Sequence, residues 1–268
     1  MPQRTGKNFL PDRNRADLAP WKPMTHAQSR RPKLLPRNLR DHLTNELGRW
    51  IVSGQLQIGQ VLPREPILAA ELNVSRTVLR EALKVLVSKG LVESRPKVGT
   101  RVRNQRHWHL LDPDVLAWRC EVMPTDDFVQ KLVEMREILE PAAAAAAAKR
   151  CTAEQLSRLD DAYVSMANAG SLEDWTSADL AFHEAMLEAT NNELMISLFA
   201  LIEASMRTFF SLSAKVAQDF RYSLPHHKKV LECIRNRKPV GARNAMRTLI
   251  SDARDNIVRG KSRKPVDE

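Results

Sequence analysis

The N-terminal fold is decided by the stretch Val61–Val102, which reads VLPREPILAAELNVSRTVLREALKVLVSKGLVESRPKVGTRV. Apolar residues at helical spacing predict a short helix ending near Leu72, then a turn, then a longer helix over Arg76–Lys89. Ser75 is a favourable N-cap, because its hydroxyl can accept a hydrogen bond from an orphan backbone N–H. Gly90 stands just past the last turn, where glycine commonly ends a helix. The stretch therefore predicts two helices joined by a tight turn.

A hairpin is predicted directly after these helices. Leu91–Arg95 and Thr100–Arg103 read as short strands, and the residues between them form the tip. Upstream, the apolar spacing over Arg37–Ser53 predicts another helix that packs on the longer one. Three helices followed by a hairpin make a winged helix-turn-helix.

The first turn of the helix over Arg76–Lys89 is polar on its outer side. Arg76, Thr77 and Arg80 point away from the apolar stripe. A recognition helix has this arrangement, because its N-terminal residues reach base edges and phosphates in the major groove of double-stranded DNA.

The charge distribution also indicates a polyanionic partner. The whole chain has a formal net charge of +10 and a pI near 9.8. Fourteen Lys and Arg stand against six acidic residues in 33–106, whereas acidic residues are in excess in 107–268. Cationic side chains gain free energy by releasing the counterions condensed on DNA. The sequence has no apolar run long enough to span a membrane, so no membrane partner is expected.

The cysteines fit a reducing compartment. Cys120, Cys151 and Cys233 are scattered singly through helical patterns, and the N-terminus lacks the apolar core of a signal peptide. We therefore expect free thiols and a cytoplasmic location.

The expected fold class is mainly α, with an N-terminal winged helix-turn-helix and a C-terminal all-helical antiparallel bundle. The expected segments are a disordered basic arm (1–32), the DNA-binding domain (33–106), a linker (107–123), the helical effector-binding domain (124–262) and a tail (263–268). The linker contains the helix start Asp112-Pro113. In the bundle, a first long helix carries Pro141, which usually kinks a helix, and further helices are expected over Thr152–Asn168, Leu172–Ala189, Asn192–Ala217, Ser223–Arg237 and Pro239–Arg259.

Four side chains of the bundle stand out by type and spacing. Asp179 and His183 are four residues apart and share a helix face, His227 follows two helices later, and Arg136 lies in the first long helix. A carboxylate with two imidazoles could hold a divalent cation. An arginine could bind a carboxylate ligand with its planar fork. The competing interpretation is a surface hydrogen bond between Asp179 and His183.

Two sets of motifs resemble a known family. The stretch VLPREPILAAELNVSRTVLREALKVLVSKGLVES and the wing RPKVGTRV resemble the winged helix of the GntR family of bacterial transcription regulators. The stretches EMREILEPAAAAAA, ADLAFHEAMLEATNN and HKKVLECI resemble its FadR-like branch, whose helical ligand-binding domain is called FCD. The linker LLDPDVLAW is similar to regulators of this branch that respond to sugar acids such as galactonate.

The resemblance implies specific contacts to DNA. Those of the recognition helix fall on Ser75, Arg76, Thr77 and Arg80, and those of the wing tip on Lys97 and Gly99. Pro66 occupies a position where the family commonly has an arginine, and Arg64, two residues earlier, is counted among the expected DNA contacts.

For the bundle, the resemblance implies that Asp179, His183 and His227 are metal ligands, with Zn or Ni as the metal. A third histidine is usual in the last helix, but Leu249 stands there. Water or oxygens of the effector would then complete the shell. Alternatively, the protein has lost the metal and Arg136, His183 and His227 bind a carboxylate directly.

The sequence thus predicts a homodimeric repressor that binds a palindromic operator and is released by a small carboxylate, a sugar acid. Asp179, His183, His227 and Arg136 would bind this effector. The alternatives are an architectural DNA-binding protein without an effector and a metal-dependent enzyme. No nucleophile adjoins the histidines, so we expect no catalytic residues.

Overall fold

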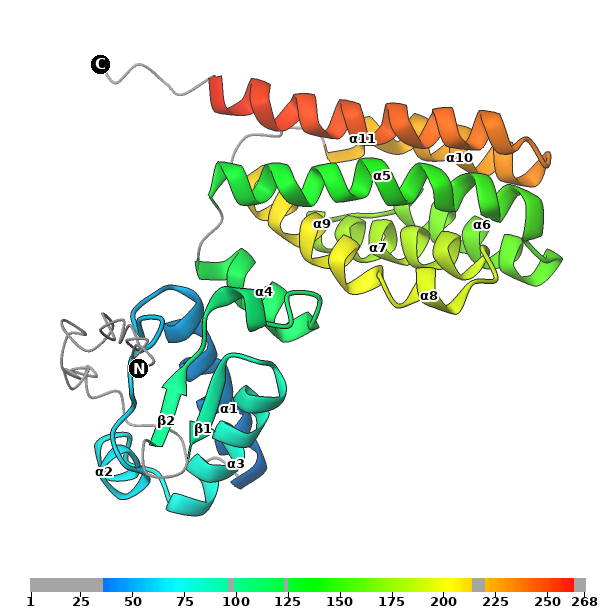
Figure 1. Ribbon diagram of the computed structural model, residues 1–268. Coiled ribbons are helices and arrows are strands. Elements are labelled where there is room, and N and C mark those ends of the chain that lie inside the picture. Colours follow the sequence, from blue (N-terminus) through cyan, green and yellow to red (C-terminus); the bar gives the residue numbers. More distant parts are fainter. Residues whose placement is uncertain (1–35, 96–98, 123–124, 214–219, 263–268) are drawn as a thin grey trace, which may run out of the picture. The chain divides into compact units, whose positions relative to one another are not determined.

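The computed structural model describes residues 36–95, 99–122, 125–213 and 220–262, and the expected arm and tail lie outside them. The chain divides into two compact units, 1–109 and 110–268 (Figure 1). The division falls inside the segment 107–123 that the sequence suggests as a linker. The first unit is a small winged helix and the second is all-helical in its described residues, so the predicted fold class is confirmed.

The first unit has the predicted element order. Its elements are α1 (Pro36–Val52), α2 (Glu65–Glu71), α3 (Arg76–Ser88), β1 (Val92–Arg95) and β2 (Gly99–Val102). Helix α1 packs against α3, and the leucines on their apolar faces are buried in the core of this unit. Ser75 caps α3 as expected, since its Oγ accepts a hydrogen bond from the backbone N–H of Val78.

The wing contains a third extended segment that the sequence did not indicate. Strands β1 and β2 pair antiparallel, with Val92 opposite Val102. On the other side of β2, Val61 forms a bridge with Arg101, and the N–H of Leu62 donates to the carbonyl of Thr100 at 2.8 Å. The loop that precedes α2 therefore anchors the wing to the helices.

The chain after the wing packs back onto the first unit. The short 3-10 helix Gln105–His107 is followed by Trp108, which is buried and whose Nε1–H donates to the carbonyl of Arg103. The N–H of His109 donates to the carbonyl of Lys89. Gly90 faces this turn of chain with a φ of +75°, and a Cβ there would lie 2.1 Å from the carbonyl oxygen of His107.

The second unit is a helical bundle (Figure 1). Its helices are α4 (Pro113–Val122), α5 (Asp126–Arg150), α6 (Ala153–Ala167), α7 (Leu172–Glu188), α8 (Glu193–Ile196), α9 (Phe199–Ser213), α10 (Leu224–Arg235) and α11 (Pro239–Ser262), with a 3-10 turn at Phe220–Ser223. Helix α5 lies along α11, α6 packs on α7, and α10 packs on α11. Asp112 caps α4 through its side chain, as the Asp-Pro pair predicts.

The prediction of one helix over Asn192–Ala217 was wrong. The structure breaks it into α8 and α9 at Ser197 and Leu198, and residues 214–219 lie outside the described part. Asn192 caps α8 by accepting from the N–H of Leu194, and the hydroxyl of Ser197 donates to the carbonyl of Glu193. Neither glycine nor proline marks this break, and the apolar spacing continues through it. The sequence therefore indicated a single helix.

Helix α5 continues through Pro141, which lies within its helical span. Proline lacks the N–H that would bond to the carbonyl of Glu137, but the helix goes on into a run of alanines. Four of these alanines are fully buried and belong to the main core: Ala143, Ala144, Ala147 and Ala148. Among the described residues, no helix combines the length and the apolar character that a membrane crossing needs.

Gly90→Ala tests how tightly the post-wing turn packs. The new Cβ would meet the His107 carbonyl at 2.1 Å, and the φ of +75° is unfavourable for alanine. We expect a loss of at least about 3 kcal/mol in the free energy of unfolding, measured by urea denaturation. Gly54→Ala is the matched control, because Gly54 has a φ of +80° but no atom within 4 Å of the added Cβ. It should cost only about 1–2 kcal/mol, and equal losses would contradict the predicted clash.

Candidate functional site

Two helices bring the predicted metal ligands together in the core of the second unit. Helix α7 is capped by Ser171 and carries Asp179 and His183, while α10 carries His227. All three side chains are buried, so the alternative of a surface hydrogen bond between Asp179 and His183 is excluded.

One carboxylate oxygen stands between the two imidazoles. Oδ1 of Asp179 lies 2.8 Å from Nε2 of His227 and 3.4 Å from Nε2 of His183. One ligand atom from each residue falls within a group whose members are all within 4.8 Å of one another. Asp179 Oδ1 and His227 Nε2 make no hydrogen bond of acceptable geometry within the described structure. Buried polar atoms that converge in this way fit a cation, since each offers it a lone pair.

The outer nitrogen of each imidazole faces an oxygen atom. Nδ1 of His227 lies 2.9 Å from the carbonyl oxygen of Ser223, one helical turn earlier. Nδ1 of His183 lies 2.6 Å from Oε2 of Glu140, although the angle of this contact departs from that of a hydrogen bond. A proton on Nδ1 leaves the lone pair on Nε2, which is the nitrogen that faces Asp179 in both residues.

Glu140 is the site residue that the sequence reasoning missed. It is fully buried on α5 and lies one turn after Arg136, whose Nε donates to its Oε1 at 2.5 Å. Arg136, predicted to bind the effector, is therefore brought to the cluster but is paired with Glu140. The spacing of four between the two residues was visible in the sequence; the approach of Glu140 to His183 on another helix was not.

Mutual pairing keeps these groups charged in spite of burial. Burial by itself would raise the pKa of Glu140, but Arg136 and His183 hold it down at about 2. Burial opposes the charged form of His183, yet Glu140 and Asp179 raise its pKa to about 9. The two histidines likewise hold the pKa of Asp179 well below its usual range, against the effect of burial. A metal bound here would displace the proton of His183, because metal ligands must be deprotonated.

Aromatic rings close the site on one side. Phe182 and Trp175 are fully buried, and both meet the ring of His227 edge to face, with centroid distances of 5.2 Å and 6.3 Å. Leu249, which stands where a third histidine was expected, is buried in the main core. Within the described residues, the metal-capable group therefore has three members.

The predicted DNA-contacting residues lie on the surface of the first unit. Arg64, Ser75, Arg76, Thr77 and Arg80 are all exposed. The guanidinium of Arg80 is paired with Glu65 of α2 at 2.9 Å, and this ion pair was not anticipated. Gly99 is exposed with a φ of +97°, a backbone conformation suited to a tight wing turn, and Lys97 lies outside the described residues.

An exposed recognition helix beside a wing, together with a separate helical unit holding a buried polar cluster, defines a DNA-binding transcription regulator with an effector domain. Residues 39–102 match the family described as bacterial regulatory proteins, gntR family, and residues 131–252 match the FCD domain. The chain belongs to the GntR family and carries a C-terminal FCD domain.

Curated relatives cover most of the chain. It is 33% identical to the uncharacterized HTH-type transcriptional regulator YieP of Escherichia coli over 74% of its length and 86% of that protein. It is 31% identical to the galactonate operon transcriptional repressor of E. coli, over 81% of its length and 95% of that protein. The matched families and relatives are transcription regulators and not enzymes.

The same fold occurs in a solved structure of Lar, described as controlling the expression of the Listeria monocytogenes agr system. The TM-score is 0.58 at 20% identity, and the match covers 85% of this chain and 98% of that one.

Arg136→Met tests the buried ion pair. It leaves Glu140 buried and without its main counter-charge, which should cost about 3–5 kcal/mol in the free energy of unfolding of the metal-free protein. Arg254→Met is the matched control. Arg254 lies on α11 and pairs with Glu137 of α5, the helix that carries Arg136, but both partners are half-exposed. It should cost less than about 1 kcal/mol. Urea unfolding followed by helical circular dichroism measures both, and similar losses would contradict the assigned burial.

Proposed function

We propose that this protein is a cytoplasmic, homodimeric repressor that leaves a palindromic operator when a small carboxylate, a sugar acid, binds its FCD domain. The observation that carries the proposal is the convergence of Asp179, His183 and His227 inside the FCD domain. The galactonate operon repressor among the relatives supports the choice of a sugar acid.

One divalent metal ion, Zn or Ni, is part of this proposal. Asp179 and the Nε2 atoms of His183 and His227 would hold it. Three protein ligands leave positions open for other oxygen donors, as in metal sites that bind substrates. The metal would act as a fixed positive charge that attracts an effector carboxylate. Nε and Nη2 of Arg136 donate to Glu140. A guanidinium has five N–H donors, so Arg136 keeps donors for an effector carboxylate and is part of the proposed effector site.

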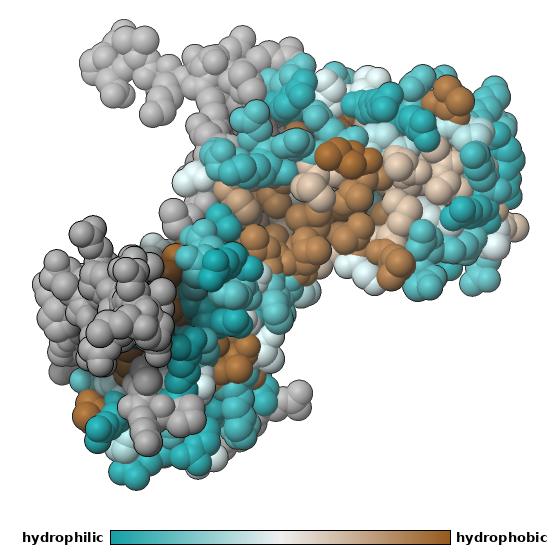
Figure 2. Space-filling model, in the orientation of Figure 1, coloured by the Kyte–Doolittle hydropathy of each residue, from teal (hydrophilic) through white to brown (hydrophobic). Residues whose placement is uncertain are grey.

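The second unit has a surface suited to pairing with another copy. Apolar side chains gather on its face over α5 and α9 (Figure 2). Large apolar residues that are exposed on α5 and α8 include Ile138, at 60%, and Leu194, at 73%. Apolar patches of this kind commonly mark interfaces. A two-fold dimer would present two recognition helices to the two half-sites of an operator.

Arg76→Ala tests the recognition helix. If Arg76 reads a base through two hydrogen bonds, binding to a duplex carrying the protein's own promoter region should weaken by about 1–3 kcal/mol, with a smaller loss on random DNA. Arg158→Ala is the control; it removes the same charge from α6 of the second unit, where Arg158 pairs with Glu188. Gel shift at fixed low salt measures both. Equal losses of Arg76→Ala on both duplexes would identify a phosphate contact instead.

His227→Ala tests the effector site, and the adjacent His226 provides the control. In a thermal-shift screen with Zn²⁺ and sugar acids, galactonate among them, binding to the folded wild type should raise Tm, and His227→Ala should lose the shift while still binding DNA. His226→Ala is the control, because His226 is partly exposed and pairs with Asp252 of α11. A shift that survives a chelator would contradict the metal and favour direct binding of the carboxylate. If no acid changes Tm or operator affinity, the effector proposal is wrong.

A further inference from the structure

We propose that Glu140 is the positioning residue of His183: its carboxylate fixes the imidazole so that Nε2 presents a lone pair to the metal position beside Asp179. This inference rests on the proposed metal site and adds to it a residue that is not itself a ligand. The group of converging ligand atoms consists of Asp179, His183 and His227 and does not include Glu140.

The two oxygens of Glu140 serve different partners. Oε1 lies 2.5 Å from Nε of Arg136, while Oε2 lies 2.6 Å from Nδ1 of His183. The second arginine contact, from Nη2 to Oε2, is longer at 3.4 Å. A carboxylate whose role was only to neutralise an arginine would favour two parallel short hydrogen bonds. Here the second oxygen is closer to the imidazole than to the guanidinium.

Because the imidazole ring is rigid, the contact at Nδ1 also sets the direction of the Nε2 lone pair. Nδ1 and Nε2 lie on opposite sides of the ring, so an acceptor at Nδ1 determines both where the proton is and where the lone pair of Nε2 points. His227 is oriented in the same way by a backbone carbonyl, that of Ser223. His183 is oriented by a charged group, which also makes the imidazole a stronger donor to a metal.

Arg136 completes the arrangement by holding Glu140 in place. Glu140 is fully buried, and a buried carboxylate needs a partner to remain ionised. In a site with three ligands, where Leu249 replaces a further histidine, the strength of each remaining ligand contributes more to affinity. Glu140 therefore supports the metal from α5, although the ligands lie on α7 and α10.

Titration of the full chain with Zn²⁺ alone, against a competing chelator, tests this role. Glu140→Gln keeps the shape and removes the charge, and it should weaken Zn²⁺ binding by about 10- to 100-fold. Glu137→Gln, one turn earlier on the same helix and half-exposed, should leave the affinity unchanged. A merely structural role would lower Tm without changing the affinity. Equal Zn²⁺ affinity of folded Glu140→Gln and wild type would overturn the proposal.

A second readout reports on the ring itself. Long-range ¹H–¹⁵N spectra of histidine-labelled, Zn²⁺-loaded protein should show the proton of His183 on Nδ1 in the wild type, with an altered Nδ1 resonance in Glu140→Gln and not in Glu137→Gln. Should Glu140→Gln fail to fold, Glu140→Asp retains the charge with a shorter reach. Wild-type affinity in a folded Glu140→Asp would then overturn the proposal. A wild type that binds no Zn²⁺ would refute the metal site itself, which is a different result from an unaffected variant.

Discussion

A row of buried ionisable side chains links three helices of the second unit. Arg136, Glu140, His183 and Asp179 follow one another at ion-pair distance, and His227 ends the chain. Each of these groups would be costly to bury alone. Because they come from α5, α7 and α10, their pairing fixes how these helices face one another. The polar groups that would coordinate an ion thus also determine the helix arrangement.

The apolar surroundings strengthen this constraint. The buried alanines give α5 a surface of small side chains within the main core, and α5 lies along α11. Phe182 and Trp175 pack edge to face against the ring of His227. Among side chains as deeply buried as these, electrostatic interactions are stronger than in water. An ion or a carboxylate bound at the proposed site would meet groups that their partners already orient.

Sequence patterns predicted the first unit well, because its signals are local. The Ser75 cap and the helix periods lie within a few residues of the elements that they define. The convergence of Asp179, His183 and His227 was predicted because these residue types are recognisable metal ligands. Glu140 was missed because its main contact with the site is on another helix, as was the pairing of Arg80 with Glu65. The break between α8 and α9 was missed because neither glycine nor proline marks it and the apolar spacing runs through it.

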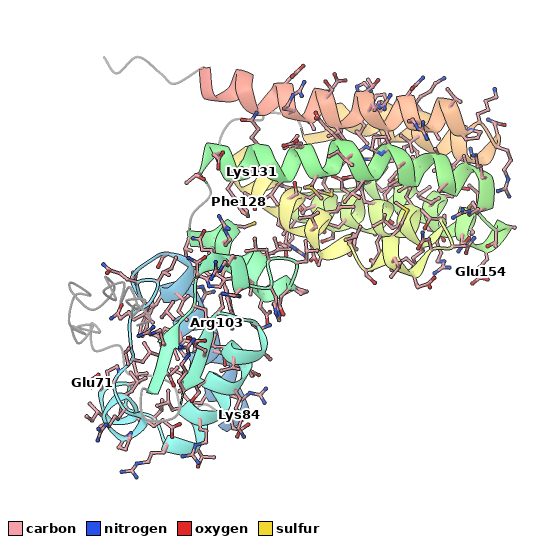
Figure 3. All side chains as sticks on the ribbon, viewed as in Figure 1. Glu71, Lys84, Arg103, Phe128, Lys131 and Glu154 are labelled. Carbon is pink, nitrogen blue, oxygen red and sulfur yellow. The ribbon has the colours of Figure 1, made fainter. Side chains whose placement is uncertain are left out.

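Helix α4 belongs to the predicted linker, but it packs against helices of the second unit. Cys120 and Leu116 of α4 pack against Ala204 and Leu201 of α9, in a small apolar cluster that also includes Leu132 of α5. Phe128, which Figure 3 labels, lies at the start of α5. Arg119 of α4 lies over its ring.

The two tryptophans of the predicted linker thus belong to different units: Trp118 is buried in the second and Trp108 in the first. Between them, Leu110 and Leu111 are exposed, and the division of the units falls at His109 and Leu110. An effector can change DNA binding only if it binds one arrangement of the units better than another. Since α7 packs on α9 and α9 packs on α4, a displacement at the site would reach α4 as a movement of packed helices.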